Sequence, residues 1–208
     1  MLKIEKTVLP SPEQWEIIIE GMRNPMNSWD RMDSSFIDEF CLGANDRNLM
    51  CGLARGGAVH AKYRRMIPVF LTIDAPLYWW KEFDTYKVGT VTNSCSTMHK
   101  IHAKEFTLSD FSHEHLGKFE RGVLKYLVEA LNRARDCFLE AKEKEHWWQM
   151  IQLLPSSYNQ KRTVMLNYEV LVNIYHSRKN HKLDEWRNFC EWIRGLPHSE
   201  MITGEYDD

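Results

Sequence analysis

The stretch that decides the fold is residues 67–98, IPVFLTIDAPLYWWKEFDTYKVGTVTNSCSTM. Residues 67–74 are rich in β-branched and large apolar side chains and predict a strand. Pro76 suits the first turn of a helix, because its missing N–H is not needed there. We therefore expect an aromatic helix next, followed by a loop from Gly89 to Thr97 made of hydroxyl, amide and thiol side chains. Such a polar loop is typical of a ligand site rather than of a core.

A second informative stretch follows Leu154-Pro155, where a helix is expected over about 160–179. Eleven residues of helix make about three turns, so Asn167 and Arg178 would share one face about 16 Å apart. A guanidinium at that end can bind a phosphate or a pyrimidine carbonyl through two parallel hydrogen bonds. Alternatively, Arg178 belongs to a basic last turn that the helix dipole favours.

The order strand, Ala-Pro, helix and polar loop resembles the flavin-dependent thymidylate synthases. In that family the helix ends in Arg-His-Arg and the loop has the pattern S-x-N-x-x-S-x-R. In an alignment without gaps, the triplet corresponds to Thr85, Tyr86 and Lys87. The fixed positions of the loop pattern correspond to Thr90, Thr92, Cys95 and Thr97. The family's later motif, N-x-R-S-L-x-N-F-x-x-x-R, matches at Asn167, Leu171, Asn173 and Arg178. Glu169 stands at the first Arg of that motif, so the scaffold matches better than the signature residues.

The resemblance implies an α+β fold that is mostly helical with a small antiparallel sheet. At 208 residues the chain is expected to form a single domain, residues 1–208. The resemblance further implies a homotetramer with sites between subunits, which would give exposed aromatic side chains a surface to pack on.

The resemblance implies a pyrimidine deoxynucleotide as substrate. The residues expected to bind it are Glu82, Thr85, Asn93, Cys95, Ser96, Thr97 and Arg178. Cys95 falls where the family has a Ser beside the uracil ring, and a thiol there can add to C6 as a catalytic nucleophile; alternatively it is a small buried hydrophobic residue. Glu82 matches a family Gln, and a carboxylate can accept a hydrogen bond from a cytosine amino group.

The resemblance also implies FAD as cofactor, with methylenetetrahydrofolate and NADPH as co-substrates. The residues expected to bind the flavin are His60, Lys62, Tyr86, Lys87, Asn167 and Asn173. Tyr86 can stack on a flavin ring or a base, although an aromatic residue on a helix is usually in the core. The basic group of Lys62, Arg64 and Arg65 either replaces phosphate-binding charge or is a solvated face.

The first functional hypothesis is therefore a flavoprotein methyltransferase that converts dUMP to dTMP, or modifies a related nucleotide. The alternative is a non-catalytic nucleotide-binding protein on the same scaffold, because the flavin signature is eroded and a fold does not guarantee a function. A third possibility, a structural oligomer, would require a ligand-free polar loop.

Composition limits the other classes. A net charge of −2 gives no electrostatic reason to expect nucleic acid as a partner. Five widely spaced cysteines without a C-x-x-C pair favour a reducing, cytoplasmic location. We expect no signal peptide, no membrane span and no metal site, since the histidine pairs His113/His115 and His176/His181 lack i,i+4 spacing and carboxylate neighbours.

Further helices are expected over about 11–24, 46–55, 112–146 and 182–194, the first with a capping box of Ser11 and Gln14. If unbroken, the helix over 112–146 would be roughly 50 Å long, so we expect it to project, break or pack against another subunit. Residues 24–46 are expected to be a mixed surface region with polar turns, in which Trp29, Phe36 and Phe40 must pack against other residues. The acidic tail, 200–208, is expected to be disordered.

Overall fold

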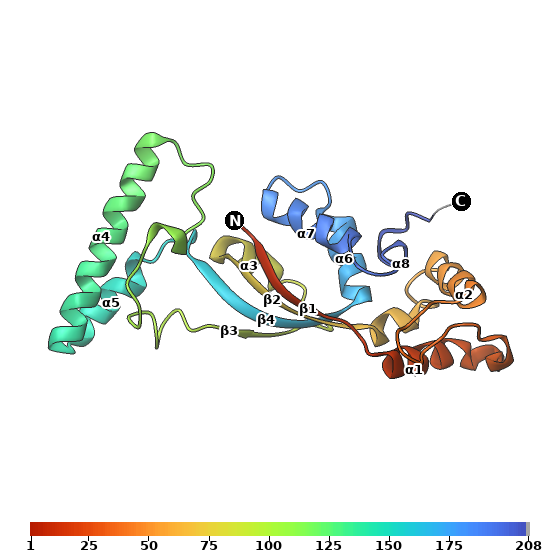
Figure 1. Cartoon of the computed structure of the whole chain (residues 1–208). Coiled ribbons are helices and arrows are strands. Elements are labelled where there is room, and N and C mark those ends of the chain that lie inside the picture. Colours follow the sequence, from red (N-terminus) through yellow and green to blue (C-terminus); the bar gives the residue numbers. More distant parts are fainter. Residues whose placement is uncertain (207–208) are drawn as a thin grey trace. The chain divides into compact units, whose positions relative to one another are not determined.

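The computed structural model describes residues 1–206, which divide into two compact units (Figure 1). Of these residues, unit 1 comprises 1–5, 73–85 and 93–163, and unit 2 comprises 6–72, 86–92 and those from 164 onward. The expectation that these units together form a single domain remains a prediction.

The four strands form a single small antiparallel sheet in the order β1-β2-β4-β3. They are β1 (Lys3–Val8), β2 (Pro68–Pro76), β3 (Val91–Ser94) and β4 (Asn159–Asn167). Every second residue of β2, from Val69 through Leu71 and Ile73 to Ala75, is buried, as the two-residue period of a strand requires. The helical content together with this sheet confirms the predicted fold class.

The structure corrects three expected boundaries, two of which lie in the stretch that decides the fold. Pro76 is the N-cap of α3 (Leu77–Phe83) rather than a residue of its first turn. The expected loop after Gly89 contains β3, which the sequence hides because all four of its side chains are exposed and none marks an apolar face. β4 occupies residues 159–167, where a helix was expected; Asn167 is only the N-cap of α6 (Tyr168–Arg178).

Unit 2 contains most of the helices. Besides α6 these are α1 (Pro12–Arg23), α2 (Ala44–Arg55), α7 (Asp184–Arg194) and α8 (Glu200–Thr203), with single turns at 24–26, 29–31 and 62–66. The predicted capping box of Ser11 and Gln14 is present at the start of α1. Residues 200–203 of the tail form α8, in which Met201 and Ile202 are buried; the expected disorder of the tail stays a prediction, and residues 207 and 208 lie outside the described part.

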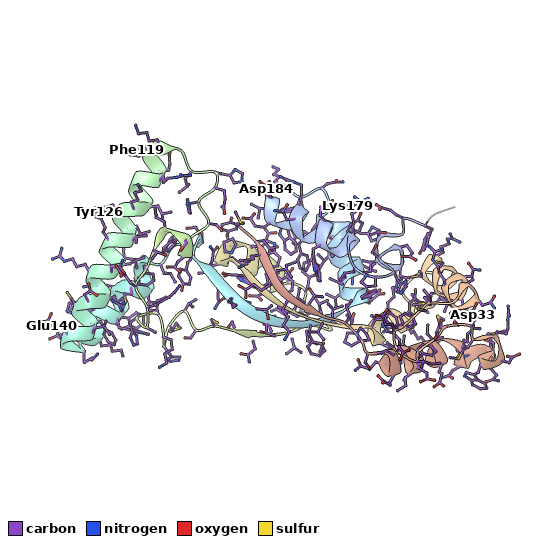
Figure 2. The ribbon with its side chains drawn as sticks, viewed as in Figure 1. Asp33, Phe119, Tyr126, Glu140, Lys179 and Asp184 are labelled. Carbon is purple, nitrogen blue, oxygen red and sulfur yellow. The ribbon has the colours of Figure 1, made fainter. Side chains whose placement is uncertain are left out.

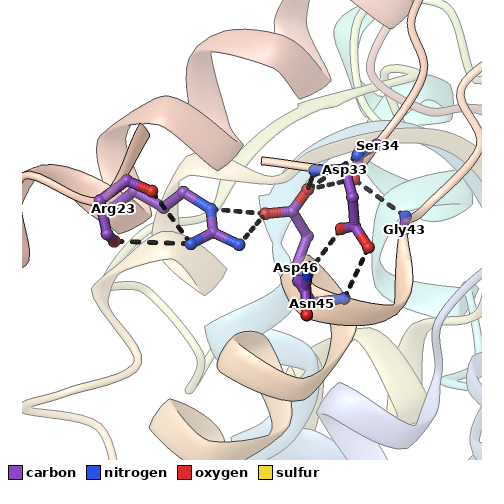
Figure 3. A network of polar contacts seen from close by, with 7 residues as sticks. Arg23, Asp33, Ser34, Gly43, Asn45 and Asp46 are labelled. Atoms are coloured by element: carbon purple, nitrogen blue, oxygen red, sulfur yellow. Dashed lines mark hydrogen bonds and ion pairs between the residues drawn. The ribbon is translucent and has the colours of Figure 1, made fainter. Parts of the chain in front are cut away.

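A buried ion pair fixes the irregular segment between α1 and α2 (Figure 3). Arg23 is 3% exposed and Asp46 is fully buried, with 2.6 Å between Arg23 Nε and Asp46 Oδ1. Asp46 Oδ2 accepts hydrogen bonds from the hydroxyl and the backbone N–H of Ser34 and from the N–H of Asp33. Asp33 in turn accepts from the first N–H groups of α2. The segment between α1 and α2 is thus fixed by the Arg23–Asp46 ion pair and its hydrogen bonds. It is also fixed by the stacking of Phe40 on Trp15, whose ring centroids lie 4.4 Å apart.

Unit 1 contains α3 and the hairpin of α4 (Lys118–Ala141) and α5 (Lys144–Leu153). The expected helix over 112–146 is broken at Lys142, which adopts a left-handed conformation (φ 58°). The break falls where the apolar pattern ends and charged residues take over, so α4 is about 36 Å long. Leu124, Val128 and Leu131 of α4 pack in a core with Met150 of α5. In residues 1–206, no helix has the length and apolar composition needed to cross a membrane.

Candidate nucleotide and cofactor site

Arg178, at the end of α6, is held by two aromatic side chains of unit 2. Its Nε donates a hydrogen bond of 2.9 Å to the hydroxyl of Tyr86. Its guanidinium carbon lies 4.8 Å from the ring centroid of Trp186 and 5.7 Å from that of Tyr86. Trp186 is completely buried and Arg178 is half-buried. The guanidinium is therefore oriented by its surroundings, which a side chain that merely complements a helix dipole does not require.

Two predicted site residues, Tyr86 and Arg178, are thus brought into direct contact. Tyr86 is neither a core residue nor an isolated stacking platform, because its hydroxyl accepts from Arg178 and its ring meets Trp186 edge to face at 6.0 Å. Lys87, the next residue, is exposed.

Asn167 has a structural role at the start of α6. Its Oδ1 accepts a 3.1 Å hydrogen bond from Val170 N–H, which caps the helix. The residue 86–92 segment packs against this cap, because a Cβ added at Gly89 would lie 3.1 Å from Asn167 Nδ2 and 3.2 Å from Val170 Cγ2. In the same segment, Thr90 Oγ1 is buried without a hydrogen-bond partner in the described part of the chain.

A cavity of about 380 Å³ in unit 2 contains Asn173. Its charged and polar lining is Arg55, Arg64, Glu169, Asn173, His176 and Tyr206. Arg64 is buried, with its Nε 3.1 Å from Glu169 Oε2 and its Nη1 donating to the carbonyl of Met201. Arg64 is therefore not part of a solvated basic face, although Lys62 and Arg65 are exposed. Arg55, whose guanidinium lies 4.4 Å from the centroid of the Tyr206 ring, was missed by sequence reasoning.

His60 and Lys62 line a different cavity of about 380 Å³, together with Met22, Tyr63 and Met66. The six residues predicted to bind the cofactor all belong to unit 2, but they do not share one cavity. His60 and Lys62 line one cavity and Asn173 lines another. Tyr86 contacts Arg178, Asn167 caps α6, and Lys87 is exposed.

Unit 1 has a polar cavity of about 360 Å³ that brings Cys95, Ser96 and Thr97 together. Cys95 is fixed through its backbone: its N–H donates to the carbonyl of Lys161 at 2.9 Å, and its carbonyl accepts from Gln160 Nε2 at 2.7 Å. The side chain of Cys95 is exposed, which contradicts the alternative of a buried hydrophobic cysteine. Ser96 Oγ accepts from the N–H groups of Met98 and His99. Asn93 is exposed on β3.

The same cavity holds charges that sequence reasoning missed. Lys161 pairs with Glu5 at 2.7 Å, and Lys104 pairs with Asp110. Asp74, near the end of β2, is half-buried, and its carboxyl group has no hydrogen bond or ion pair with any described residue. Burial raises the pKa of the Asp74 carboxyl and raises that of the Tyr158 hydroxyl to about 12. The sequence did offer one sign of this residue, because Asp74 is the single acidic residue at the end of an apolar strand.

Glu82 and Thr85 lie at the end of α3 and do not line this cavity. Thr85 Oγ1 donates to the backbone carbonyl of Glu82 at 2.7 Å, which satisfies one of the last carbonyls of the helix. Glu82 is half-buried and Thr85 is exposed. Within residues 1–206, no three His, Cys, Asp or Glu side chains are grouped as a metal site.

The chain is similar over nearly its whole length to several solved structures. Thymidylate synthase X from Helicobacter pylori, solved with FAD and dUMP, has a TM-score of 0.67 at 17% identity, covering 98% of this chain and 96% of that one. A second structure, flavin-dependent thymidylate synthase from the same organism complexed with FAD and dUMP, has a TM-score of 0.65 at 16% identity, with coverage of 98% and 97%.

A UMP/dUMP methylase, PolB from Streptomyces cacaoi bound with 5-Br dUMP, has a TM-score of 0.61 at 13% identity and covers 98% of this chain and 94% of that one. No protein-family model matches the chain, and no curated protein sequence matches it. At these identities the likeness concerns the fold.

Proposed function

Because the chain has the fold of the flavin-dependent thymidylate synthases, we propose that it is a flavoprotein methyltransferase acting at C5 of a pyrimidine deoxynucleotide. Conversion of dUMP to dTMP, or a closely related modification, is the reaction that the fold supports best. The observation that carries the proposal is the contact between Arg178 and Tyr86, which orients a guanidinium at a position that the resemblance assigns to the nucleotide.

Arg178 would bind a phosphate or a pyrimidine carbonyl through a planar, directional guanidinium. Cys95, Ser96 and Thr97, which line one cavity, would contact the nucleotide in unit 1. Glu82, Thr85 and Asn93 complete the proposed binding set. We propose a homotetramer in which such residues of different subunits contribute to one site.

Cys95 is the proposed nucleophile. As a thiolate its sulfur would bond to C6 of the ring, and the electron pair of the C5–C6 double bond would move to C5 and the neighbouring carbonyl. Reversal of this addition at the end of the reaction frees the thiol. Its side chain is exposed in this cavity and therefore accessible to a pyrimidine ring, which supports the proposal.

FAD is the proposed cofactor, with His60, Lys62, Tyr86, Lys87, Asn167 and Asn173 as its binding residues. The unit 2 cavity suits parts of such a ligand, because Arg55 offers a positive charge and Tyr206 an aromatic face beside Asn173. When bound, FAD would supply hydride, with methylenetetrahydrofolate as the carbon donor and NADPH as the reductant. The chain's own part is to bind and orient these groups.

A non-catalytic nucleotide-binding protein is the second candidate function, and one observation favours it. Glu169 stands where the family motif has an Arg, and its carboxylate is paired with Arg64. Positive charges of the family motifs are thus missing at Thr85, Thr97 and Glu169, while Arg178 is kept.

The test is an absorption spectrum of the purified protein, with and without added FAD, followed by titration with dUMP and dCMP. A flavin spectrum that the nucleotide perturbs would support the enzyme and identify its base. A protein that binds a nucleotide but no flavin would favour the second candidate. If neither ligand binds, both proposals fail.

A further inference from the structure

The unit 1 cavity of about 360 Å³ contains a carboxyl group that the chain itself leaves without a partner. Two of the charged residues that line it are neutralised by neighbours: Lys161 pairs with Glu5 at 2.7 Å, and Lys104 pairs with Asp110. The carboxyl group of Asp74 lines the same cavity, and no residue in the described part of the chain gives it a hydrogen bond or an ion pair. Asp74 is therefore free to contact a ligand.

The polar side chains that surround Asp74 are used by other residues. Their hydrogen bonds run from Ser112 Oγ to Asn159 Oδ1, from Gln160 Nε2 to the carbonyl of Cys95, from Arg162 Nε to Gln160 Oε1, and from the N–H groups of Met98 and His99 to Ser96 Oγ. These contacts fix the wall of the cavity and supply no donor to the Asp74 carboxyl group.

The position of Asp74 is unfavourable for a carboxylate in the free protein. Burial disfavours the charged form and raises the pKa of this carboxyl group, and the charge of Glu5 adds to the shift. The ammonium groups of Lys161, Lys104 and Lys3 act in the opposite direction, but burial outweighs them. A half-buried acid without a partner, placed in a cavity, is typical of a binding site.

Tyr158 adds a hydrogen-bond donor to the same cavity. Its ring packs edge to face on Phe111, with 5.6 Å between the centroids, and no described residue forms a hydrogen bond with its hydroxyl. Burial raises the pKa of this hydroxyl to about 12, so it keeps its proton at neutral pH. Charges at Asp74 and Cys95 both add to that shift, so both groups lie within electrostatic range of the hydroxyl.

We propose that Asp74 selects a pyrimidine with an amino group at C4, so that the protein binds dCMP more tightly than dUMP. An ionised carboxylate can only accept hydrogen bonds. Cytosine has the N4 amino donor where uracil has the O4 acceptor, so the carboxylate attracts the first base and repels the second.

The hydroxyl of Tyr158 would donate to N3 of cytosine, which is an acceptor. dUMP remains a weaker ligand through the sugar and phosphate that both nucleotides share. The inference rests on the proposed function and names its base. It assigns the selection to Asp74 rather than to Glu82, which does not line this cavity.

The first test measures the dissociation constants of dCMP and dUMP by isothermal titration calorimetry. We expect the wild type to bind dCMP about 10- to 100-fold more tightly, as a hydrogen bond to a charged group allows. Asp74→Asn keeps the size of the side chain and removes its charge, so this preference should fall at least ten-fold, mainly through weaker binding of dCMP. The matched control is Glu140→Gln, which removes an exposed carboxylate from the last turn of α4 (Figure 2) and should keep the preference.

The outcomes separate this inference from the proposed function. A wild type that binds neither nucleotide contradicts the proposed function and the inference together. A wild type that binds dUMP at least as tightly as dCMP, or an Asp74→Asn variant that keeps the preference, overturns the inference alone.

Urea unfolding of the ligand-free protein at pH 7 provides a second test. Because the Asp74 carboxylate has no partner to lose, Asp74→Asn should unfold at the same urea midpoint as the wild type or at a higher one. A lower midpoint would show that the carboxylate stabilises the fold instead of serving a ligand, and would overturn the inference.

Discussion

The hydroxyl of Tyr86 accepts a 2.9 Å hydrogen bond from Nε of Arg178, across 92 residues of sequence. This contact joins the segment after α3 to the end of α6, and Trp186 of α7 lies beside both side chains. Three elements of unit 2 thus converge on one guanidinium, whose orientation is set before any ligand arrives. Preorganisation of this kind lowers the entropy lost on binding.

Replacing Arg178 with Ala is expected to weaken dUMP binding about 10- to 100-fold, because hydrogen bonds to a charged group contribute about 1.5–3 kcal/mol. Isothermal titration calorimetry measures the affinity, and a thermal melt checks the fold. Arg187→Ala is the matched control, since Arg187 is exposed and pairs only locally with Asp184 and nearby carbonyls. Unchanged affinity in Arg178→Ala would remove this residue from the site.

Asp46→Asn is expected to lower the free energy of unfolding by about 3–5 kcal/mol, because it leaves the buried Arg23 charge without a counter-charge. Urea denaturation measures the loss. Asp84→Asn, which breaks the more exposed pair with Arg162, should cost no more than about 1 kcal/mol. Equal losses in the two variants would contradict the assignment of Arg23–Asp46 as the fixing contact.

Thiol labelling is expected to separate the five cysteines by exposure. Cys41 and Cys95 are exposed and should react fast, whereas Cys51 and Cys190 are buried. Burial raises the pKa of both buried thiols, that of Cys190 to about 11, so little thiolate is available. Added dUMP should slow labelling of Cys95 and leave Cys41 unchanged, as peptide mass spectrometry would report. A Cys95 rate that is insensitive to a bound nucleotide would place this thiol outside the site.

Stability is expected to fall as the pH drops below about 6.5, the ordinary pKa of histidine. Burial lowers the pKa of His198, so between the ordinary and the lowered value the unfolded chain binds a proton that the folded chain excludes. Glu200 opposes this shift and Arg47 adds to it. Urea unfolding at pH 7.5, 6 and 5 should show a shallower decline in His198→Asn, a residue type that tolerates the positive φ of 55° at this position. Identical slopes would show that other groups cause the decline.

Gly89→Ala is expected to destabilise the protein more than Gly57→Ala does. Both glycines have a left-handed φ, 79° and 87°, which costs another residue about 1–2 kcal/mol. At Gly57 an added Cβ meets no atom within 4 Å, whereas at Gly89 it meets Asn167 and Val170. The difference between the two urea midpoints isolates the steric part, and similar midpoints would contradict the close approach.

The sequence predicted those elements whose signals are local. The capping box at Ser11 and the apolar alternation from Val69 to Ala75 are written into consecutive residues. β3 escaped prediction because its pairing to β4 lies far away in the chain and its side chains are all exposed. β4 escaped because Thr163 to Leu166 suit a strand or a helix equally well, and only the neighbouring strands decide between them.

The candidate site likewise contains features that local sequence predicts and features that only tertiary contacts decide. Placing Arg178 near a ligand needed only motif spacing, but its contact with Tyr86 depends on how the segment 86–92, α6 and α7 pack within unit 2. The unpaired Asp74 and the Arg64–Glu169 pair were not predictable, because a charge acquires or loses its partner only through tertiary contacts.

The contact of Gly89 with the cap of α6 also limits how this protein can evolve. A side chain at position 89 must displace the amide that starts the helix bearing Arg178. Substitutions in the polar loop are therefore constrained by the start of this helix. In a library that randomises residues 88–97 and is selected for folded protein, position 89 should remain glycine while its exposed neighbours vary. Changes of ligand specificity in this loop would then have to come from residues other than Gly89.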